Sequence, residues 1–279
     1  MAAMSLADRA AIRILADDGA AFLQGLLTAD VTALAPGGSA PAALLTPQGK
    51  VLFDMVLSRC EQGFWIDCRA GDAEDLAGRL SFYRLRASVD IEPAPDIHIV
   101  WSPPGAPEPD GLTPDPRHSA LGLRGLSLES PASDGTAAYH ACRIAAGIAE
   151  AGIDYDRDTV FPHEANLDLL GGISFTKGCF IGQEVVSRMH HRGTARKRFL
   201  PCAVEGGLPA KGTPVTAGER TIGAVGSSAA ASALALLRLD RLEAAHRARI
   251  PVMAADARLR PRIPGWAAGA AGDLARELA

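Results

Sequence analysis

The stretch FPHEANLDLLGGISFTKGCFIGQEVVSRMHHRGTARKR, residues 161–198, holds most of the distinctive residue combinations of the chain. It contains a glycine pair, a Lys-Gly-Cys run at residues 177–179, a Gly-Gln-Glu run at residues 182–184 and a basic tail. Residues 177–198 carry six Lys or Arg and one acid, Glu184, a local charge of +5 in a chain of net charge −4. The stretch therefore predicts a local anion-facing surface on a mildly acidic protein.

The runs KGCFIGQE (residues 177–184) and HHRGTARKR (residues 190–198) resemble the signature of the folate-binding proteins related to the glycine-cleavage T-protein. Within that group they are most similar to the iron–sulfur cluster assembly branch, the YgfZ- and IBA57-like proteins. The resemblance is strongest over residues 161–198, moderate over residues 22–54 and weak through the proline-rich segment and the C-terminal region.

This resemblance implies an α+β fold with two interleaved α+β domains, a small C-terminal antiparallel β-barrel and a central cavity. We expect a folate-binding region over residues 1–198, in which residues 1–45 join residues 137–198 and residues 46–136 are inserted. The barrel is expected over residues 199–266. The Ala- and Gly-rich residues 267–279 are expected to form a frayed tail.

Composition describes a soluble globular chain, because 48% of its residues are hydrophobic and 22% are charged. No apolar run approaches the roughly 18 residues needed to cross a bilayer, so we expect no membrane association. The N-terminus lacks the order of a signal peptide, and Asp8, Asp17 and Asp18 argue against a transit peptide, so a cytoplasmic location is expected.

Five widely spaced cysteines, an odd number, indicate free thiols in a reducing compartment. No two of them form a Cys-x-x-Cys pair, and the only adjacent histidines are His190 and His191. We therefore predict no stably bound metal or iron–sulfur cluster.

Local patterns predict several elements of secondary structure. Residues 20–31 place Phe22, Leu23, Leu26 and Leu27 on one face of a helix, with Asp17 or Asp18 as a cap. Thr46-Pro47-Gln48-Gly49 fits a type I turn inside a hairpin over residues 42–57. Further predictions are a strand at 64–68, a helix after Asp72, an exposed proline-rich loop at 102–118, a strand at 121–128, a helix at 137–149 and barrel strands at 199–204, 213–216, 221–225, 233–239 and 252–259.

The hairpin also carries a departure from the T-protein. The T-protein has tandem acids after this turn, one of them assigned to methylene transfer, whereas this chain has Phe53 before Asp54. The incomplete acidic pair argues against aminomethyltransferase activity.

Cys179 is the candidate reactive residue. A cysteine acts as a nucleophile or metal ligand only as the thiolate, which cationic neighbours such as Lys177 and the basic tail would favour. A buried inert thiol is the alternative, since free cysteines are commonly buried. The resemblance favours the active role, because the T-protein carries an acid where the iron–sulfur branch, like this chain, carries Cys179.

Glu164 and Asn166 are candidates for tetrahydrofolate recognition. A carboxylate can accept two hydrogen bonds from the aminopyrimidine edge of a pterin, and the resemblance places a folate-contacting acid in this neighbourhood. The alternative for Glu164 is a local cap or pair.

The rest of the signature supplies further candidate folate contacts, and Lys177 is the first of them. Gly178 and Gly182 would let the backbone approach a ligand, and Gln183 and Glu184 could begin a helix that receives an anion or is merely capped. The run 188–198, beginning with Arg188, could hold the glutamate tail of folate, contact RNA or an acidic protein, or form a solvated strand face on which at most one of His190 and His191 faces the site. Without interleaved aromatic residues, nucleic-acid binding is not favoured.

The resemblance implies a tetrahydrofolate-binding factor for assembly or repair of [4Fe-4S] proteins. Its implied partners are folate, iron–sulfur scaffold or carrier proteins and client [4Fe-4S] enzymes. Two alternatives stay open: a folate-dependent aminomethyltransferase or other one-carbon transferase, and a tRNA-modification accessory factor that would use the basic run but not the thiol. Whether the protein is an enzyme is left open.

Overall fold

The computed structural model describes residues 3–15, 19–85, 87–193, 195–272 and 274. These residues form two compact units. The first unit comprises Met1–Tyr139 and Leu170–Val185, and the second comprises His140–Leu169 and Val186–Ala279.

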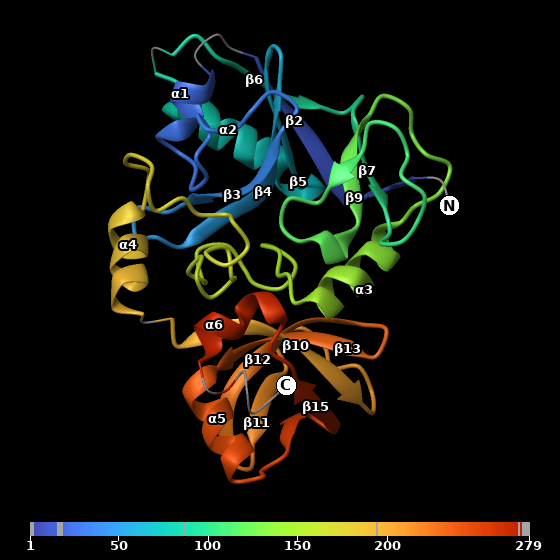
Figure 1. The fold of residues 1–279 in the computed structure, drawn as a ribbon, viewed down its shortest axis with the longest axis vertical. Helices are drawn as coiled ribbons and strands as arrows, with labels where there is room; N and C mark the ends of the chain where they lie inside the picture. Colours follow the sequence, from blue (N-terminus) through green and yellow to red (C-terminus); the bar gives the residue numbers. More distant parts are fainter. Residues whose placement is uncertain (1–2, 16–18, 86, 194, 273, 275–279) are drawn as a thin grey trace. The chain divides into compact units, whose positions relative to one another are not determined.

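A five-stranded antiparallel sheet forms the centre of the first unit (Figure 1). Its strands, in spatial order, are β3 (Ser39–Leu45), β4 (Val51–Cys60), β5 (Gly63–Arg69), β2 (Arg9–Leu15) and β6 (Asp90–Ala94). Helices α1 (Gly19–Gln24) and α2 (Ala73–Tyr83) pack on one face of the sheet, where Leu23, Leu76 and Leu80 are fully buried. Alternation along the strands therefore directs one row of side chains into this core. A short 3₁₀ helix, Ala70–Asp72, leads into α2.

The predicted hairpin is confirmed. Strands β3 and β4 pair antiparallel, and in the turn between them the Gly49 amide donates to the Thr46 carbonyl over 2.8 Å. Gly49 has a φ of 78°, a conformation that glycine adopts without steric cost. The expected domain boundary after residue 45 falls inside this sheet, because the two strands are hydrogen-bonded neighbours.

The predicted helix at 20–31 is shorter in the structure. Helix α1 ends at Gln24, whose side-chain oxygen accepts a hydrogen bond from the Val31 amide over 2.7 Å. Leu27 instead forms a bridge to Leu44 in β3, so apolar spacing that fits a helix is buried here by a turn. The expected caps Asp17 and Asp18 lie outside the described residues.

A four-stranded antiparallel sheet completes the first unit. Its strands, in spatial order, are β1 (Met4–Ser5), β7 (His98–Ser102), β9 (Leu123–Ser127) and β8 (Thr113–Pro114). A 3₁₀ helix, Ser119–Leu121, precedes β9, and α3 (Thr136–Ala146) follows it. The proline-rich segment is not uniformly exposed as predicted, because Asp115 is buried and ion-paired with Arg117.

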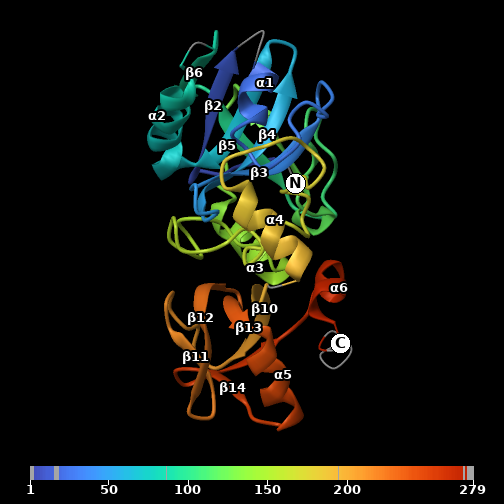
Figure 2. The ribbon, with the colours of Figure 1, turned by 90° about the vertical axis from the view of Figure 1, so that its left-hand side faces the viewer.

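The second unit contains a closed antiparallel barrel (Figure 2). Its strands, in spatial order, are β10 (Lys197–Glu205), β13 (Ser232–Arg238), β12 (Arg220–Ala229), β11 (Pro214–Ala217), β14 (Val252–Ala254) and β15 (Ala257–Pro261). The single strand predicted at 252–259 is a hairpin of two strands with Ala255 at a φ of 50°. Helix α5 (Leu239–Arg247) packs on the barrel through Leu242 and Ala245.

The end of the chain is partly helical where it is described. A 3₁₀ helix, Gly265–Ala267, leads into α6 (Ala268–Ala271), so the predicted frayed tail begins with an ordered turn. Within the described residues, every helix is too short or too polar to cross a membrane.

Candidate functional site: an exposed thiol on an anchored loop

The loop at residues 170–182, in the first unit, is anchored by Lys177. The Lys177 ammonium donates hydrogen bonds to the carbonyl oxygens of Leu27, over 2.7 Å, and Ala29, over 2.6 Å, and lies 5.3 Å from the Phe180 ring centroid. The side chain is buried, and burial lowers the pKa of Lys177 to about 8 against the opposing charge of Asp30. Lys177 therefore points into the protein and holds the loop, and its ammonium is not presented to a ligand.

Thr28 supplies a second anchor for the same loop. Its hydroxyl donates to the Gly172 carbonyl over 2.5 Å and accepts from the Ala43 amide over 2.8 Å. Its carbonyl accepts from the Ser174 amide over 2.9 Å. The loop is thus tied on both sides of residue 173 to a segment that is itself bonded to β3.

Cys179 is the most accessible thiol of the chain. All five cysteines are described and carry reduced thiols; Cys179 is exposed, Cys60 and Cys142 are half-buried, and Cys68 and Cys202 are buried. Burial raises the pKa of both Cys68 and Cys202 to about 12, so these two stay protonated. Chemistry that needs a thiol at the surface falls to Cys179.

The two glycines flanking this cysteine differ in what surrounds them. A Cβ on Gly178 would meet nothing within 4 Å, so the position next to Cys179 is open. A Cβ on Gly182, whose φ is 80°, would lie 2.6 Å from the Thr46 carbonyl oxygen. Gly182 is therefore explained by close packing against the β3–β4 turn, and ligand approach is not needed to account for it.

Helix α4 (Gln183–Arg192) follows, and it corrects the strand expected for Arg188, His190 and His191. Gln183 begins the helix, and Glu184 lies exposed in its first turn, where a negative charge stabilises the helix dipole. Arg188 is also exposed. The helix start predicted at Gln183 and Glu184 is confirmed, and Val186 is buried on one face of the helix.

In the second unit, the side chains of Asn166 and Arg198 form hydrogen bonds with other residues of the same unit. The Asn166 amide donates to the Phe199 carbonyl over 2.8 Å and accepts from Arg198 over 3.1 Å, and its φ is 62°. Arg198 also forms a two-pronged pair with Asp168, at 2.9 and 2.8 Å, and donates to the His163 carbonyl over 2.7 Å. Both side chains are buried. Asn166 therefore does not present its amide for the folate contact predicted for it, and Arg198 is not the exposed end of the basic run.

Glu164 lies in the same turn but is only half-buried. Its Oε2 atom accepts a hydrogen bond from the Phe161 amide over 2.9 Å, which is the local cap that the sequence left open. A carboxylate has about four lone-pair positions, so this one bond leaves acceptor capacity on both oxygens.

Phe53 and Asp54 lie on opposite faces of β4, as alternation in a strand requires. Phe53 is 5% exposed and belongs to the hydrophobic core of the first unit, whereas Asp54 is half-buried on the other face. The missing acid at residue 53 therefore removes nothing from the face that carries Asp54. The absence of an acid at residue 53 is therefore a weaker argument against transferase activity than the sequence alone indicated.

A buried charge cluster in this protein was not predicted from the sequence. It joins Arg9, Asp67 and Arg124 to Asp115 and Arg117 in the first unit. The Asp-Pro-Arg run at residues 115–117 was a possible signal, but its proline-rich surroundings indicated an exposed loop.

Comparison with solved structures supports the fold. The chain superposes on the crystal structure of the glycine cleavage system aminomethyltransferase T from Bartonella henselae with a TM-score of 0.68. The match covers 85% of this chain and 78% of that one at 18% identity, and it shows the fold alone. Residues 196–269 match the family described as CAF17, C-terminal beta-barrel domain, in agreement with the barrel strands.

Curated relatives are similar over most of the chain. The mouse (Mus musculus) protein named iron-sulfur cluster assembly factor IBA57, mitochondrial, is 33% identical over 84% of this chain and 77% of its own. The human (Homo sapiens) protein of the same name is 32% identical over 95% of this chain and 85% of its own. The chain belongs to the YgfZ/IBA57 family of T-protein-like proteins.

Membership of the YgfZ/IBA57 family corrects the expected location. The cytoplasmic expectation is contradicted by these relatives, each of which is named a mitochondrial protein. Of the three acids used against a transit peptide, Asp8 belongs to the folded protein, since its carbonyl accepts from the Ala70 amide over 2.7 Å, and Asp17 and Asp18 lie outside the described residues. Such an acid carries no information about targeting.

Within this family member, the described residues contain no group of three His, Cys, Asp or Glu side chains placed to hold a metal ion. Cys179 thus has no ready-made ligand set around it in the described part of the chain. Cluster chemistry at Cys179 would need ligands from another molecule.

Proposed function

We propose that this protein serves the assembly of iron–sulfur proteins and that the Cys179 thiol is its reactive group. The observation that carries the proposal is an exposed cysteine on a loop anchored by Lys177 and Thr28, in a chain whose relatives are named iron–sulfur cluster assembly factors. An anchored loop presents the thiol in a defined position to a partner.

The ligand count supports a shared mode of action. Iron in clusters is held mainly by cysteine thiolates, commonly four for each cluster. One thiol from this chain would complete a set supplied by a scaffold, a carrier or a client [4Fe-4S] enzyme. The cluster is cargo in this proposal, and Cys179 gives up its proton when it binds iron.

Complementation tests this role. The host cells should lack the gene for their own homologue of this protein. In them we expect the wild-type protein and Cys142→Ser to restore the activity of a [4Fe-4S] enzyme. Cys179→Ser should leave that activity near the level seen with the empty vector. Cys142 is half-buried, so it is a matched thiol control. Unfolding midpoints should agree among the three proteins, and full restoration by Cys179→Ser would exclude the role.

We also propose that tetrahydrofolate binds through Glu164, whose half-buried carboxylate retains acceptor capacity for the pterin edge. Gln183, Glu184, Arg188 and the open position at Gly178 are secondary candidates. Asn166 and Lys177 do not fit as direct contacts, because their polar atoms hold the fold. Bound folate would supply a pterin and a one-carbon carrier.

Calorimetric titration with tetrahydrofolate tests this part separately. We expect Glu164→Ala to weaken binding at least about tenfold, the effect of about 1.4 kcal/mol from a lost charge-assisted pair. Cys179→Ser and the exposed control Glu61→Ala should bind like wild type. Unchanged binding by Glu164→Ala would remove Glu164 from the site without touching the role of Cys179.

The fold and Asp54 also support a second candidate, a folate-dependent one-carbon transferase. It predicts tetrahydrofolate-dependent release of ammonia from an aminomethyl donor, abolished by Asp54→Asn. Turnover that survives Cys179→Ser would favour this candidate over thiol chemistry.

A further inference from the structure

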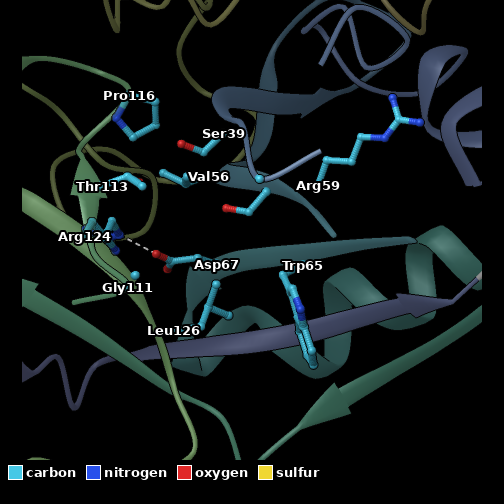
Figure 3. A pocket seen from close by; sticks show the side chains of 13 residues that line it. Ser39, Val56, Arg59, Trp65, Asp67, Gly111, Thr113, Pro116, Arg124 and Leu126 are labelled. Carbon is cyan, nitrogen blue, oxygen red and sulfur yellow. Dashed lines mark hydrogen bonds and ion pairs between the residues drawn. The ribbon is translucent and has the colours of Figure 1, made fainter. Parts of the chain in front are cut away.

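A cavity of about 210 Å³ lies in the first unit, beside the buried charge cluster (Figure 3). Its wall combines residues of the five-stranded sheet with residues of the four-stranded sheet and its loop. They include Ser39, Val56, Trp65, Thr113, Arg124 and Leu126. A water molecule occupies about 30 Å³ in the liquid, so the cavity has room for a small molecule.

The ion pairs of the charge cluster involve both of its aspartates. Arg9 donates to Asp67 over 2.8 Å, Arg124 donates to the other oxygen of Asp67, and Arg117 donates to Asp115 over 2.6 Å. Burial would raise the pKa of Asp67 and of Asp115, but the adjacent arginines hold both values below the usual range. Both aspartates are therefore ionised and paired with arginine.

Arg124 carries the unmet hydrogen-bonding capacity of this cluster. Only 4% of the residue is exposed, yet its buried Nη1 and Nη2 atoms donate no hydrogen bond to any described residue. The Asp115 Oδ2 atom is 3.6 Å from Nη1, which is beyond hydrogen-bond length. Buried polar groups without acceptors are rare and costly, so an acceptor is expected there.

We propose that this cavity binds a small oxyanion, a carboxylate or phosphate group, held by the guanidinium of Arg124. Such a group matches the fork of an arginine and carries the opposite charge. The hydroxyls of Ser39 and Thr113 in the wall add possible donors. A water molecule could accept from the same N–H groups, but it carries no charge to complement the guanidinium. Nη1 and Nη2 are buried, so residues 111–116 of the wall must move before an anion can reach these two atoms. This inference is independent of Cys179 and Glu164.

Thermal unfolding of the full chain with inorganic phosphate, with acetate and with chloride at equal ionic strength tests the proposal. We expect one or both oxyanions to raise the unfolding midpoint saturably, by about 5–10 °C at a hundred times the dissociation constant. Chloride should not. Phosphate alone would identify a phosphate-bearing ligand, and acetate alone a carboxylate. No saturable effect of either oxyanion would overturn the proposal.

Variants locate the effect in this cavity. Ser39→Leu should fill the cavity and abolish stabilisation by the anion, whereas the exposed control Ser81→Leu should retain it. Arg124→Lys keeps the charge but loses the fork, so binding should weaken at least tenfold; if it fails to fold, Ser39→Leu decides. Trp65 also lines the cavity, so anion binding can change its fluorescence. Trp65→Phe should lose that change in fluorescence but keep the rise in unfolding midpoint. Equal stabilisation of Ser39→Leu and wild type would place the anion elsewhere and refute the site.

Discussion

The loop at residues 170–182 and the turn at residues 161–169 differ in what they present. In the loop, Lys177 faces inward and bonds backbone carbonyls, and this leaves Cys179 exposed. In the turn, Asn166 bonds to Arg198 and to backbone, whereas Glu164 is half-exposed and uses one carboxylate oxygen for a local cap. In each segment a strongly polar side chain, Lys177 or Asn166, forms hydrogen bonds inside the protein. Charged and polar residues in such a motif can therefore stabilise the fold as well as form a binding site.

The largest expected effect comes from breaking the framework of the turn. Arg198→Met removes the bidentate salt bridge to the Asp168 carboxylate, whose side chain is 8% exposed. Loss of one member of a buried pair typically costs about 3–5 kcal/mol, because the other charge stays buried. Urea unfolding should show this loss of unfolding free energy.

The matched control is Arg196→Met, two residues earlier and exposed, which should change stability by less than about 0.5 kcal/mol. Equal costs at residues 196 and 198 would show that Arg198 is a surface cation, as its place in the basic run suggested.

A pair of glycine substitutions sharpens the comparison inside the loop. Gly182→Ala should cost about 2–4 kcal/mol, since its φ is 80° and the new Cβ would lie 2.6 Å from the Thr46 oxygen. Gly178→Ala has open space and should change stability by less than about 1 kcal/mol. Chemical denaturation measures both. A larger loss for Gly178→Ala would mean that the residue before Cys179 is strained.

Local chemistry predicted the elements that depend on nearby residues. Thr46-Pro47-Gln48-Gly49 forms its turn because proline and glycine meet the backbone requirements within four residues. The barrel strands were also predicted, since short alternating segments between turn residues need no distant information.

Burial of charges could not be predicted in this way. Arg124 and its partner Asp67 are 57 residues apart, and Arg198 and Asp168 are 30 apart. Each arginine is buried because an unrelated segment brings a carboxylate to it, and a lone sequence shows only a charged residue. Sequence located Cys179 by resemblance, but exposure and anchoring required the fold.

Removing the loop anchor should have a moderate effect on stability and a specific effect on the thiol. Lys177→Met leaves the carbonyls of Leu27 and Ala29 without their buried donor, at a cost of about 1–3 kcal/mol. The loop should loosen, so hydrogen exchange at residues 172–180 should accelerate. Unchanged exchange would show that Thr28 alone anchors the loop. Lys211→Met, at an exposed ion pair, is the matched control.

The smallest expected effect is a dependence of stability on pH through Lys177. Burial lowers its pKa from 10.5 to about 8, so between these values the unfolded chain holds a proton that the folded chain has released. Unfolding free energy must then rise with pH across that window and stay level below it, by at most about 1.4 kcal/mol for each pH unit. We expect about 1–2 kcal/mol from pH 8 to 10, measured as the difference between wild type and Lys177→Met so that other titrating groups cancel. The neutral amine still has two N–H bonds for the two carbonyls, so the anchor survives the loss of charge. A difference that falls with pH would mean that the carbonyls and Asp30 stabilise the charged form more than burial opposes it.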